Sequence, residues 1–379
     1  MSLRELDAYA RLPLDVVASE GDELILRDGR RLLDFYGGHC VNSLGAGAPA
    51  LGAALSAQWS QLSFATNLLD LDVRADFLEA FGATLPAGDW RVFLSNSGAE
   101  ANENALKGAL AATGRGTVVC FDGAFHGRTA ASAAVSDGAS TGFPRTPFEV
   151  RRLRPGDLDQ AAEAIDGQVA AVIVEPIQAL AGVVELGAAF LGALRALCDA
   201  SGAQLIFDEV QTGSGRLGSP WAAQHYGVVP DGITTAKGAG AGVPIGITIY
   251  GASVHERLPS GLHGSTFGGG PLALVAATEV ARRVASGELC ASAQSAYERL
   301  ASGLPAGPVQ ALRGAGLLLG LELAPELTAK AVQAELLEQD ILVGLSKHPR
   351  VLRLTPPLTM APNRMDRLVA ALHAMEVCA

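Results

Sequence analysis

Short apolar runs alternate with longer segments of helical character through the middle of the chain, from about residue 50 to residue 270. Short apolar runs fit strands that are buried on both faces, as in a parallel sheet. Their alternation with helices predicts a mostly parallel sheet covered by helices on both faces, an α/β fold. The predicted strands are 92–94, 118–121, 171–174, 205–207, 233–235 and 245–250, and the predicted helices include 100–112, 158–165 and 190–200.

The pattern differs at both ends of the chain. Residues 16–36 hold two apolar runs around Asp28-Gly29, a turn signal, and predict a hairpin or meander. A long alanine-rich helix is expected over about 271–285. Beyond this helix, residues 316–323 and 351–354 look like strands of a smaller α+β domain.

The length and composition set the number of domains. A chain of 379 residues is too long for one small core, and 49% hydrophobic residues with 45 glycines indicate a globular protein with many tight turns. We expect an N-terminal segment at 1–48 that joins the small domain, a large domain at 49–270 and a C-terminal small domain at 271–379.

Charge and cysteine usage narrow the class of protein. A net charge of −11 without a basic stripe argues against binding to nucleic acid. No apolar stretch suits a signal peptide or a membrane span, so we expect a cytoplasmic protein without membrane association. The five cysteines lack CxxC spacing, and Cys120 and Cys198 are expected to be reduced core residues. His126 has no partners at metal-ligand spacing, and no metal site is predicted.

Polar residues cluster directly after five of the predicted strands. In an open α/β sheet the ligand lies outside the carboxyl ends of the strands. Five clusters at that edge therefore predict one site, and this favours an enzyme over a protein with unrelated polar surface residues. The clusters are 95–100, 122–128, 175–178, 208–211 and 236–238.

Asp208 and Lys237 each end an apolar run, and together they suit pyridoxal phosphate chemistry. The amine of a lysine forms a Schiff base with the aldehyde of this cofactor. A carboxylate keeps the pyridine nitrogen protonated, so that the ring acts as an electron sink. Each residue alone would more often be an ordinary surface side chain, but the five clusters favour a site.

Ser97-Gly98-Ala99 opens a predicted helix, where free backbone N–H groups and the helix dipole favour a single phosphate. The same residues also fit an ordinary N-cap with Glu100 or Glu103 in the first turn. Nucleotide-phosphate motifs such as GxxxxGK[ST] are absent from the sequence.

Three further residues have both a structural and a functional interpretation. Phe125 could stack on a flat aromatic ring or belong to the core. Arg128 could bind a carboxylate or lie in solvent. Arg353 interrupts an apolar strand, where an unpaired charge is costly, so a ligand carboxylate or a protein acid must meet it.

The sequence resembles the class III pyridoxal-phosphate aminotransferases of fold type I, in the acetylornithine, succinylornithine and ornithine aminotransferase group. The similarity covers nearly the whole chain, and the motifs are highly specific in combination. They are Asp34-Phe35-Tyr36-Gly37-Gly38-His39, residues 96–103, Phe125-His126-Gly127-Arg128-Thr129, residues 206–213, Ala236-Lys237-Gly238 and residues 264–269.

The resemblance implies a role for each site residue. Lys237 would form the Schiff base and carry the proton between carbon centres, Asp208 would pair with the pyridine nitrogen, and Glu175 would be an active-site acid. The implied cofactor contacts are Phe125, Val210 and Gln211 at the ring, Ser97, Gly98 and Ala99 at the phosphate, and Thr266 at the phosphate of the neighbouring subunit. The implied substrate contacts are Arg128, Arg353 and Asn42.

A shared phosphate contact implies a homodimer, and two positions depart from the family pattern. Leu180 stands where the family commonly has the acid that pairs with the second arginine. Gly45-Ala46 replaces a usual Gly-His pair near the mouth of the site. Both differences affect the preference for the acyl group and leave the cofactor unchanged.

The expected activity is a ping-pong transamination in arginine biosynthesis. N-acetylornithine gives its terminal amino group to 2-oxoglutarate, which yields a semialdehyde and glutamate. N-succinylornithine, ornithine, an acylated lysine or 4-aminobutyrate are alternative donors within the class. A mutase or decarboxylase would share Lys237 and Asp208, but it would not need two carboxylate-binding arginines and would not exchange with 2-oxoglutarate. A non-catalytic binding protein would not need the intact lysine, acid and phosphate loop.

Overall fold

A seven-stranded sheet forms the centre of the larger part of the molecule. The computed structural model describes residues 3, 5–6, 8–138, 142–143 and 148–375. Five neighbouring strands, β11, β10, β7, β5 and β6, are parallel, and β12 runs antiparallel between β11 and β4. In sheet order the strands are β4 (Trp90–Ser95), β12 (Gly246–Gly251), β11 (Gly232–Ala236), β10 (Gln204–Asp208), β7 (Val169–Val174), β5 (Thr117–Phe121) and β6 (Glu149–Leu153).

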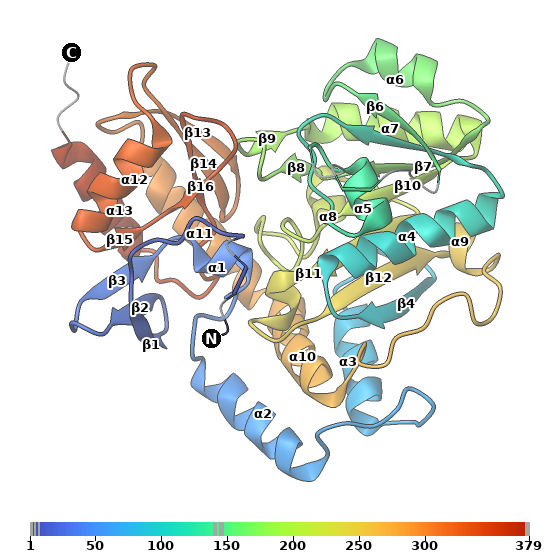
Figure 1. Cartoon of the computed structure of the whole chain (residues 1–379), viewed down its shortest axis with the longest axis horizontal. Helices are drawn as coiled ribbons and strands as arrows, with labels where there is room; N and C mark the ends of the chain where they lie inside the picture. Colours follow the sequence, from blue (N-terminus) through green and yellow to red (C-terminus); the bar gives the residue numbers. More distant parts are fainter. Residues whose placement is uncertain (1–2, 4, 7, 139–141, 144–147, 376–379) are drawn as a thin grey trace.

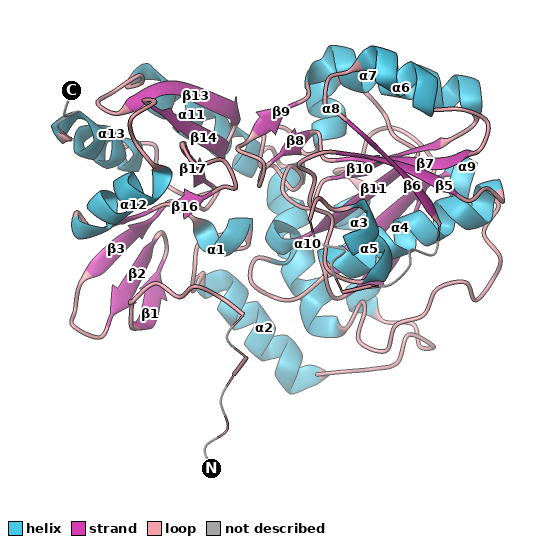
Figure 2. Ribbon diagram, turned by 45° about the horizontal axis from the view of Figure 1, so that its top comes forward, coloured by secondary structure: helices cyan, strands magenta, loops and turns pink. Residues whose placement is uncertain are grey.

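Helices cover both faces of this sheet, as the alternating pattern predicts (Figure 2). Successive residues of a strand point to opposite faces. Val118 packs in a cluster with α4 (Gly98–Thr113), whereas its neighbour Val119 packs in a cluster with α7 (Gly187–Ser201). All six residues of β7 are buried, and this explains its unbroken apolar sequence. The fold is therefore the α/β fold that the sequence predicts.

The predicted strands and helices correspond to observed ones, and one strand of the seven-stranded sheet, β6, was missed. β6 has the sequence Glu-Val-Arg-Arg-Leu and is an edge strand of the sheet. Polar side chains are tolerated in this strand because no further strand pairs with its outer edge. Its polar composition hides it from a search for apolar runs. The structure also contains α3 (Asp72–Gly82), α5 (Ala130–Val135), α6 (Leu158–Ala164), α8 (Ala222–Tyr226), α9 (Ala252–His255), β8 (Ile177–Gln178), β9 (Val184–Glu185) and the short 3-10 helix η1 (Lys237–Gly240).

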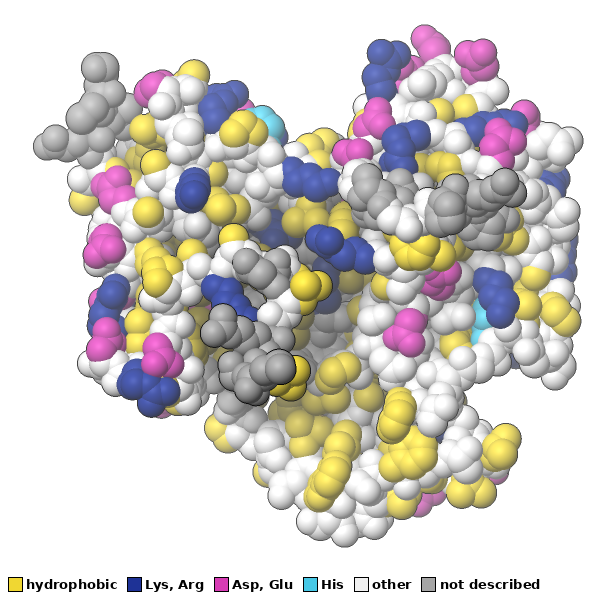
Figure 3. Space-filling view, viewed as in Figure 1, with side chains coloured by type: hydrophobic (Ala, Val, Ile, Leu, Met, Phe, Trp, Pro, Cys, Tyr) yellow, Lys and Arg dark blue, Asp and Glu magenta, His cyan; other side chains and the backbone are white. Residues whose placement is uncertain are grey.

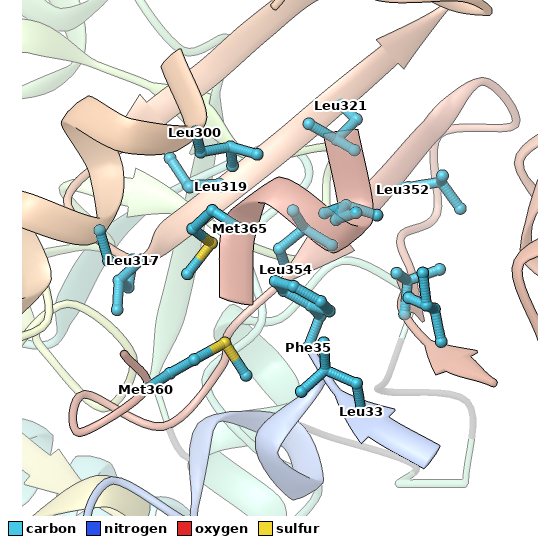
Figure 4. Close-up of a cluster of buried hydrophobic side chains, with 14 of the residues drawn as sticks. Leu33, Phe35, Leu300, Leu317, Leu319, Leu321, Leu352, Leu354, Met360 and Met365 are labelled. Atoms are coloured by element: carbon cyan, nitrogen blue, oxygen red, sulfur yellow. The ribbon is translucent and has the colours of Figure 1, made fainter. Parts of the chain in front are cut away.

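The N-terminal meander and the C-terminal elements lie together in the smaller part of the molecule (Figure 1). β3 (Arg31–Asp34) pairs in parallel with β15 (Ile341–Leu342), so the N-terminal meander joins a sheet with a C-terminal strand. Leu33 and Phe35 pack with Leu354 and Met365 in one core cluster (Figure 4). The other elements here are β1 (Val16–Glu20), β2 (Glu23–Leu26), α1 (Gly37–Cys40), α11 (Glu288–Ser302), β13 (Val309–Ala315), β14 (Leu318–Leu323), α12 (Ala329–Glu338), β16 (Gly344–Leu345), β17 (Val351–Leu354) and α13 (Arg364–Ala374).

The helix α10 (Pro271–Ala285) lies between the two parts and contributes to both cores. Ala276 and Val280 pack in the cluster of the smaller part, whereas Leu274 and Ala277 pack in the cluster of the larger part. α2 (Pro49–Gln61) also contacts α10. The exact domain bounds at residues 48 and 270 stay a prediction, because α10 belongs to neither core alone.

The sequence raised two questions that the described residues address: the state of the cysteines and the presence of membrane-spanning helices. Cys40, Cys120, Cys198 and Cys290 are buried free thiols, and Cys378 lies outside the described residues. Among the described residues, no helix is both long enough and apolar enough to cross a membrane.

Candidate active site

A cavity of about 270 Å³ lies at the carboxyl ends of the central strands. Residues that follow β4, β5, β7, β10 and β11 line it, so the structure brings the five predicted polar clusters together. Figure 3 shows the hollow between the two parts of the molecule. Its lining consists of Gly98, Ala99, Asn102, Phe125, His126, Gly127, Arg128, Glu175, Asp208, Val210, Gln211 and Lys237.

Asp208 is the most strongly fixed acid of the cavity. Its Oδ2 accepts hydrogen bonds from Asn102 Nδ2 at 2.8 Å and from His126 Nδ1 at 2.7 Å. Its Oδ1 accepts from the backbone N–H of Val210 at 3.0 Å. A carboxylate oxygen can only accept, so the three donors fix both oxygens of this side chain. The arrangement therefore holds a negative charge at a fixed place and orientation in a buried site.

Lys237 follows β11 at a strained turn. Its φ is 45°, in the left-handed region that side chains other than glycine rarely adopt. Burial lowers the pKa of its amine, the charge of Arg353 acts in the same direction, and nearby acids oppose the change. A lowered pKa increases the share of neutral amine, the form that attacks a carbonyl carbon.

The start of α4 fits both interpretations of Ser97-Gly98-Ala99. Ser97 is the N-cap: its Oγ accepts from the backbone N–H of Glu100 at 3.2 Å and donates to Glu100 Oε2 at 2.9 Å. Gly98 and Ala99 line the cavity, and a side chain at Gly98 would lie 3.0 Å from Val210 Cγ2. The backbone of the first turn is thus open to an anion.

Glu175 and Phe125 are linked across two strands. The backbone N–H of Phe125 donates to Glu175 Oε1 at 2.7 Å. Burial raises the pKa of Glu175 to about 7, while His126 lowers it and Asp208 raises it further. This acid can therefore both hold and release a proton near neutral pH, and it also fixes the loop that carries the Phe125 ring.

Arg353 lies beside the cavity on β17 and is only 2% exposed. Its Nη1 donates to Gln211 Oε1 at 3.4 Å, and its Nη2 donates to Tyr36 Oη at 3.0 Å. Within the described part of the chain no carboxylate lies at ion-pair distance from it, and its Nε is buried without a partner. The charge that interrupts this strand is thus met by neutral groups.

Of the remaining predicted residues, Arg128 lines the cavity, and Asn42 and Thr266 do not. Arg128 is exposed and lines it, with its guanidinium carbon 5.8 Å from the centre of the Phe125 ring. Asn42 lies against Gly38 and does not line the cavity. Thr266 is exposed on the loop before α10 and lies outside it too. Leu180 is in the β8–β9 turn, where its carbonyl accepts from the backbone N–H of Lys347.

Sequence reasoning missed the role of Asn102, and for His126 it left both a ligand contact and a structural role open. Asn102 Nδ2 also donates to the backbone carbonyl of His126, and its Oδ1 accepts from Thr234 Oγ1 at 2.6 Å. Asn102 lies one turn beyond the start of α4, on the buried face of this helix. The signal in the sequence is an amide at a position of the apolar face, because a buried amide needs hydrogen-bond partners.

Comparison with known proteins identifies the relatives of this chain. The family model described as Aminotransferase class-III matches residues 7–375. The chain is 40% identical to an acetylornithine aminotransferase of Mycobacterium tuberculosis, over 98% of this chain and 93% of the relative. It is 38% identical to a succinylornithine transaminase of Citrobacter koseri, over 97% and 94% of the two chains.

Solved structures share the same fold. An ornithine aminotransferase from Toxoplasma gondii superposes with a TM-score of 0.87 at 29% identity, over 97% of this chain and 91% of that one. An S-selective transaminase from an Arthrobacter species has a TM-score of 0.86 at 23% identity, over 98% and 95% of the two chains. At that identity the second likeness shows the fold alone.

Proposed function

The chain belongs to the class III aminotransferases, which use pyridoxal 5′-phosphate, and from this we propose that it is an N-acylornithine transaminase. It moves the terminal amino group of N-acetylornithine to 2-oxoglutarate, which gives the corresponding semialdehyde and glutamate. The observation that carries the proposal is that a lysine, a fixed acid and an open helix N-terminus converge in one cavity. The names of its relatives support the acetylated donor first and the succinylated donor second.

The residues of the cavity suit the cofactor in charge, shape and chemistry. The first turn of α4, opened by Gly98 and Ala99, would hold the phosphate. Phe125 and Val210 would contact the ring, and Asp208 would pair with its nitrogen. When bound, the cofactor supplies an aldehyde that accepts the amino group and a ring that stabilises negative charge on the neighbouring carbon.

The side chains around the reacting centre divide the work. Lys237 would hold the cofactor through its amine, and the same amine would serve as the base that moves a proton between the two carbon atoms that change hydrogen. Asp208, whose carboxylate is held by three donors, would pair with the ring nitrogen and keep it protonated. Glu175 holds the loop of Phe125 and provides an acid whose pKa of about 7 lies close to neutral pH.

The two arginines account for substrates that carry carboxylates. Arg128 lies exposed at the wall of the cavity, where a substrate carboxylate can reach it from solvent. Arg353 is buried with an unpartnered Nε, and a second carboxylate, such as that of 2-oxoglutarate, would satisfy it. A mutase or decarboxylase would have no use for this second cation.

We also propose a homodimer, with Thr266 acting in the site of the other subunit. Apolar side chains gather over α2 and the loop that follows it (Figure 3). Trp59 of α2 is 64% exposed, Leu68 of that loop is 90% exposed, and Phe267 on the loop before α10 is 68% exposed. Exposed apolar groups of this size mark an interaction surface. A cytoplasmic location is the remaining part of the proposal, and it rests on the sequence.

Separate half-reactions test the proposed function. The protein is loaded with pyridoxal phosphate and mixed with one donor at a time, without an acceptor. N-acetylornithine should change the visible absorbance of the bound cofactor, and 2-oxoglutarate should restore it. N-succinylornithine, ornithine and 4-aminobutyrate are run in parallel. Release of carbon dioxide, or no response to any terminal amine, would contradict the proposal.

A further inference from the structure

Three neutral side chains surround the buried guanidinium of Arg353. Tyr36 Oη and Gln211 Oε1 accept from it at 3.0 and 3.4 Å, and His39 Nδ1 lies 3.4 Å from its Nη2. The ring of Tyr36 also faces the cation, 5.3 Å from the guanidinium carbon. A buried charge needs partners, and here the partners solvate the charge without neutralising it.

The polar groups form a chain that begins at the cation. Nη2 of Arg353 donates to Tyr36 Oη, and this hydroxyl is hydrogen-bonded to His39 Nδ1. Because Nδ1 of His39 also faces Nη2 of Arg353, which can only donate, Nδ1 is assigned as an acceptor. Tyr36 Oη then donates to Nδ1, and the imidazole is neutral with its proton on Nε2. Burial, Arg353 and Lys237 all lower the pKa of His39, in that order, in agreement with a neutral ring.

The backbone holds this pair of rings in place. His39 has a φ of 62°, in a left-handed run with Gly37, Gly38 and Cys40. A Cβ on Gly37 would lie 2.3 Å from the carbonyl oxygen of Thr355, so the run is pressed against the segment that follows Arg353. Strain of this kind persists where the surroundings fix it, and it is typical of functional sites.

We propose that His39, acting through Tyr36, is a positioning residue that caps Arg353 and determines which substrates reach this arginine. The inference rests on the proposed transaminase function. A carboxylate that binds an arginine in the bidentate manner takes two neighbouring N–H groups. Nε is free, but the cap holds Nη2.

Discrimination between the two half-reactions follows from this arrangement. A dicarboxylate such as 2-oxoglutarate must take Nη2 from Tyr36 and His39 before it binds Arg353 with both oxygens. A donor whose single carboxylate binds at Arg128 leaves the cap closed. Because the cap is neutral, its displacement leaves no unpaired anion behind, as displacement of an acid would.

Two substitutions at one position separate the cap from the backbone that carries it. His39→Gly removes the side chain and tolerates a positive φ. His39→Asn also tolerates this φ and keeps a neutral acceptor, but it cannot titrate. His225→Asn, on α8 and outside the cavity lining, is the matched control.

The KM for 2-oxoglutarate reports the state of the cap. In His39→Gly it should fall about tenfold, the ratio that one net hydrogen bond of about 1.4 kcal/mol gives. The rate of the N-acetylornithine half-reaction should stay nearly unchanged, and His39→Asn should stay close to the wild type at neutral pH. An unchanged or raised KM for 2-oxoglutarate in His39→Gly would overturn the proposal.

A pH profile separates the cap from a purely structural role. Protonated His39 cannot accept at Nδ1 and adds a positive charge beside Arg353 and Lys237. The wild-type KM for 2-oxoglutarate should therefore fall as pH drops through the lowered pKa of His39, and His39→Asn should lack this dependence. Identical profiles in the two proteins would refute the cap. Failure of the wild type in the donor half-reaction would instead refute the proposed function.

Discussion

Replacement of Asp208 by asparagine removes a charge with almost no change in shape. The wild-type carboxylate accepts two donors at Oδ2 and one at Oδ1. An asparagine has one oxygen and one NH₂ group, so its NH₂ must face at least one donor in either orientation. If its oxygen stays with Asn102 and His126, the NH₂ faces the backbone N–H of Val210, and it would offer the ring nitrogen no negative charge. The variant can thus fold, but it no longer stabilises a protonated ring.

The size of the effect follows from the loss of one close charge pair. We expect kcat to fall at least about a hundredfold, roughly 3 kcal/mol of transition-state stabilisation. The free energy of unfolding of the variant should be about 1–3 kcal/mol lower than that of the wild type, because one buried donor loses its acceptor. Glutamate formation gives kcat, and thermal denaturation gives stability.

The matched control for this experiment is the neighbouring acid. Glu209 is fully buried, caps the start of α8 through the backbone N–H groups of Ala222 and Ala223, and does not line the cavity. Glu209→Gln should lower stability and leave kcat of the folded fraction close to that of the wild type. A near-normal kcat in Asp208→Asn would mean that another acid protonates the ring, and the reasoning would be refuted.

Three further predictions concern single residues. Lys237→Ala should still bind the cofactor yet lose turnover by several orders of magnitude, and borohydride reduction with peptide mapping should label Lys237 alone in the wild type. Leu180→Glu should shift donor preference toward ornithine, since a new acid could cover Arg353 when a free α-ammonium group is bound; an unchanged ranking of kcat/KM for ornithine, N-acetylornithine and N-succinylornithine counts against this. Burial raises the pKa of Glu209 from 4.5 to about 7, so the folded state keeps a proton that the unfolded chain releases. The free energy of unfolding should therefore fall by about 3 kcal/mol as the pH rises from about 4.5 to about 7. In Glu209→Gln the free energy of unfolding should depend less steeply on pH over this range.

The buried strands and the common edge of the sheet could be predicted from the sequence because their signals are local. An apolar run that ends in Asp208 or Lys237 places both residues at a carboxyl edge without knowledge of any contact. The polar edge strand β6 has no such run, and its place depends on pairing with β5.

The partners of the site residues could not be predicted, because they come from distant segments. Asn102 and His126 meet Asp208 only after α4 and the β5 loop pack together. Tyr36 and His39 reach Arg353 from more than 300 positions away, through a left-handed backbone that the sequence indicates only by Gly37-Gly38.

Transfer of labelled nitrogen tests the central claim most directly. N-acetylornithine labelled with nitrogen-15 at its terminal amine is incubated with 2-oxoglutarate and the cofactor-loaded protein, and glutamate is analysed by mass spectrometry. We predict that glutamate carries the label and forms in equal amount to the semialdehyde, and that the Lys237→Ala protein forms neither. Unlabelled glutamate, or semialdehyde without glutamate, would contradict the account.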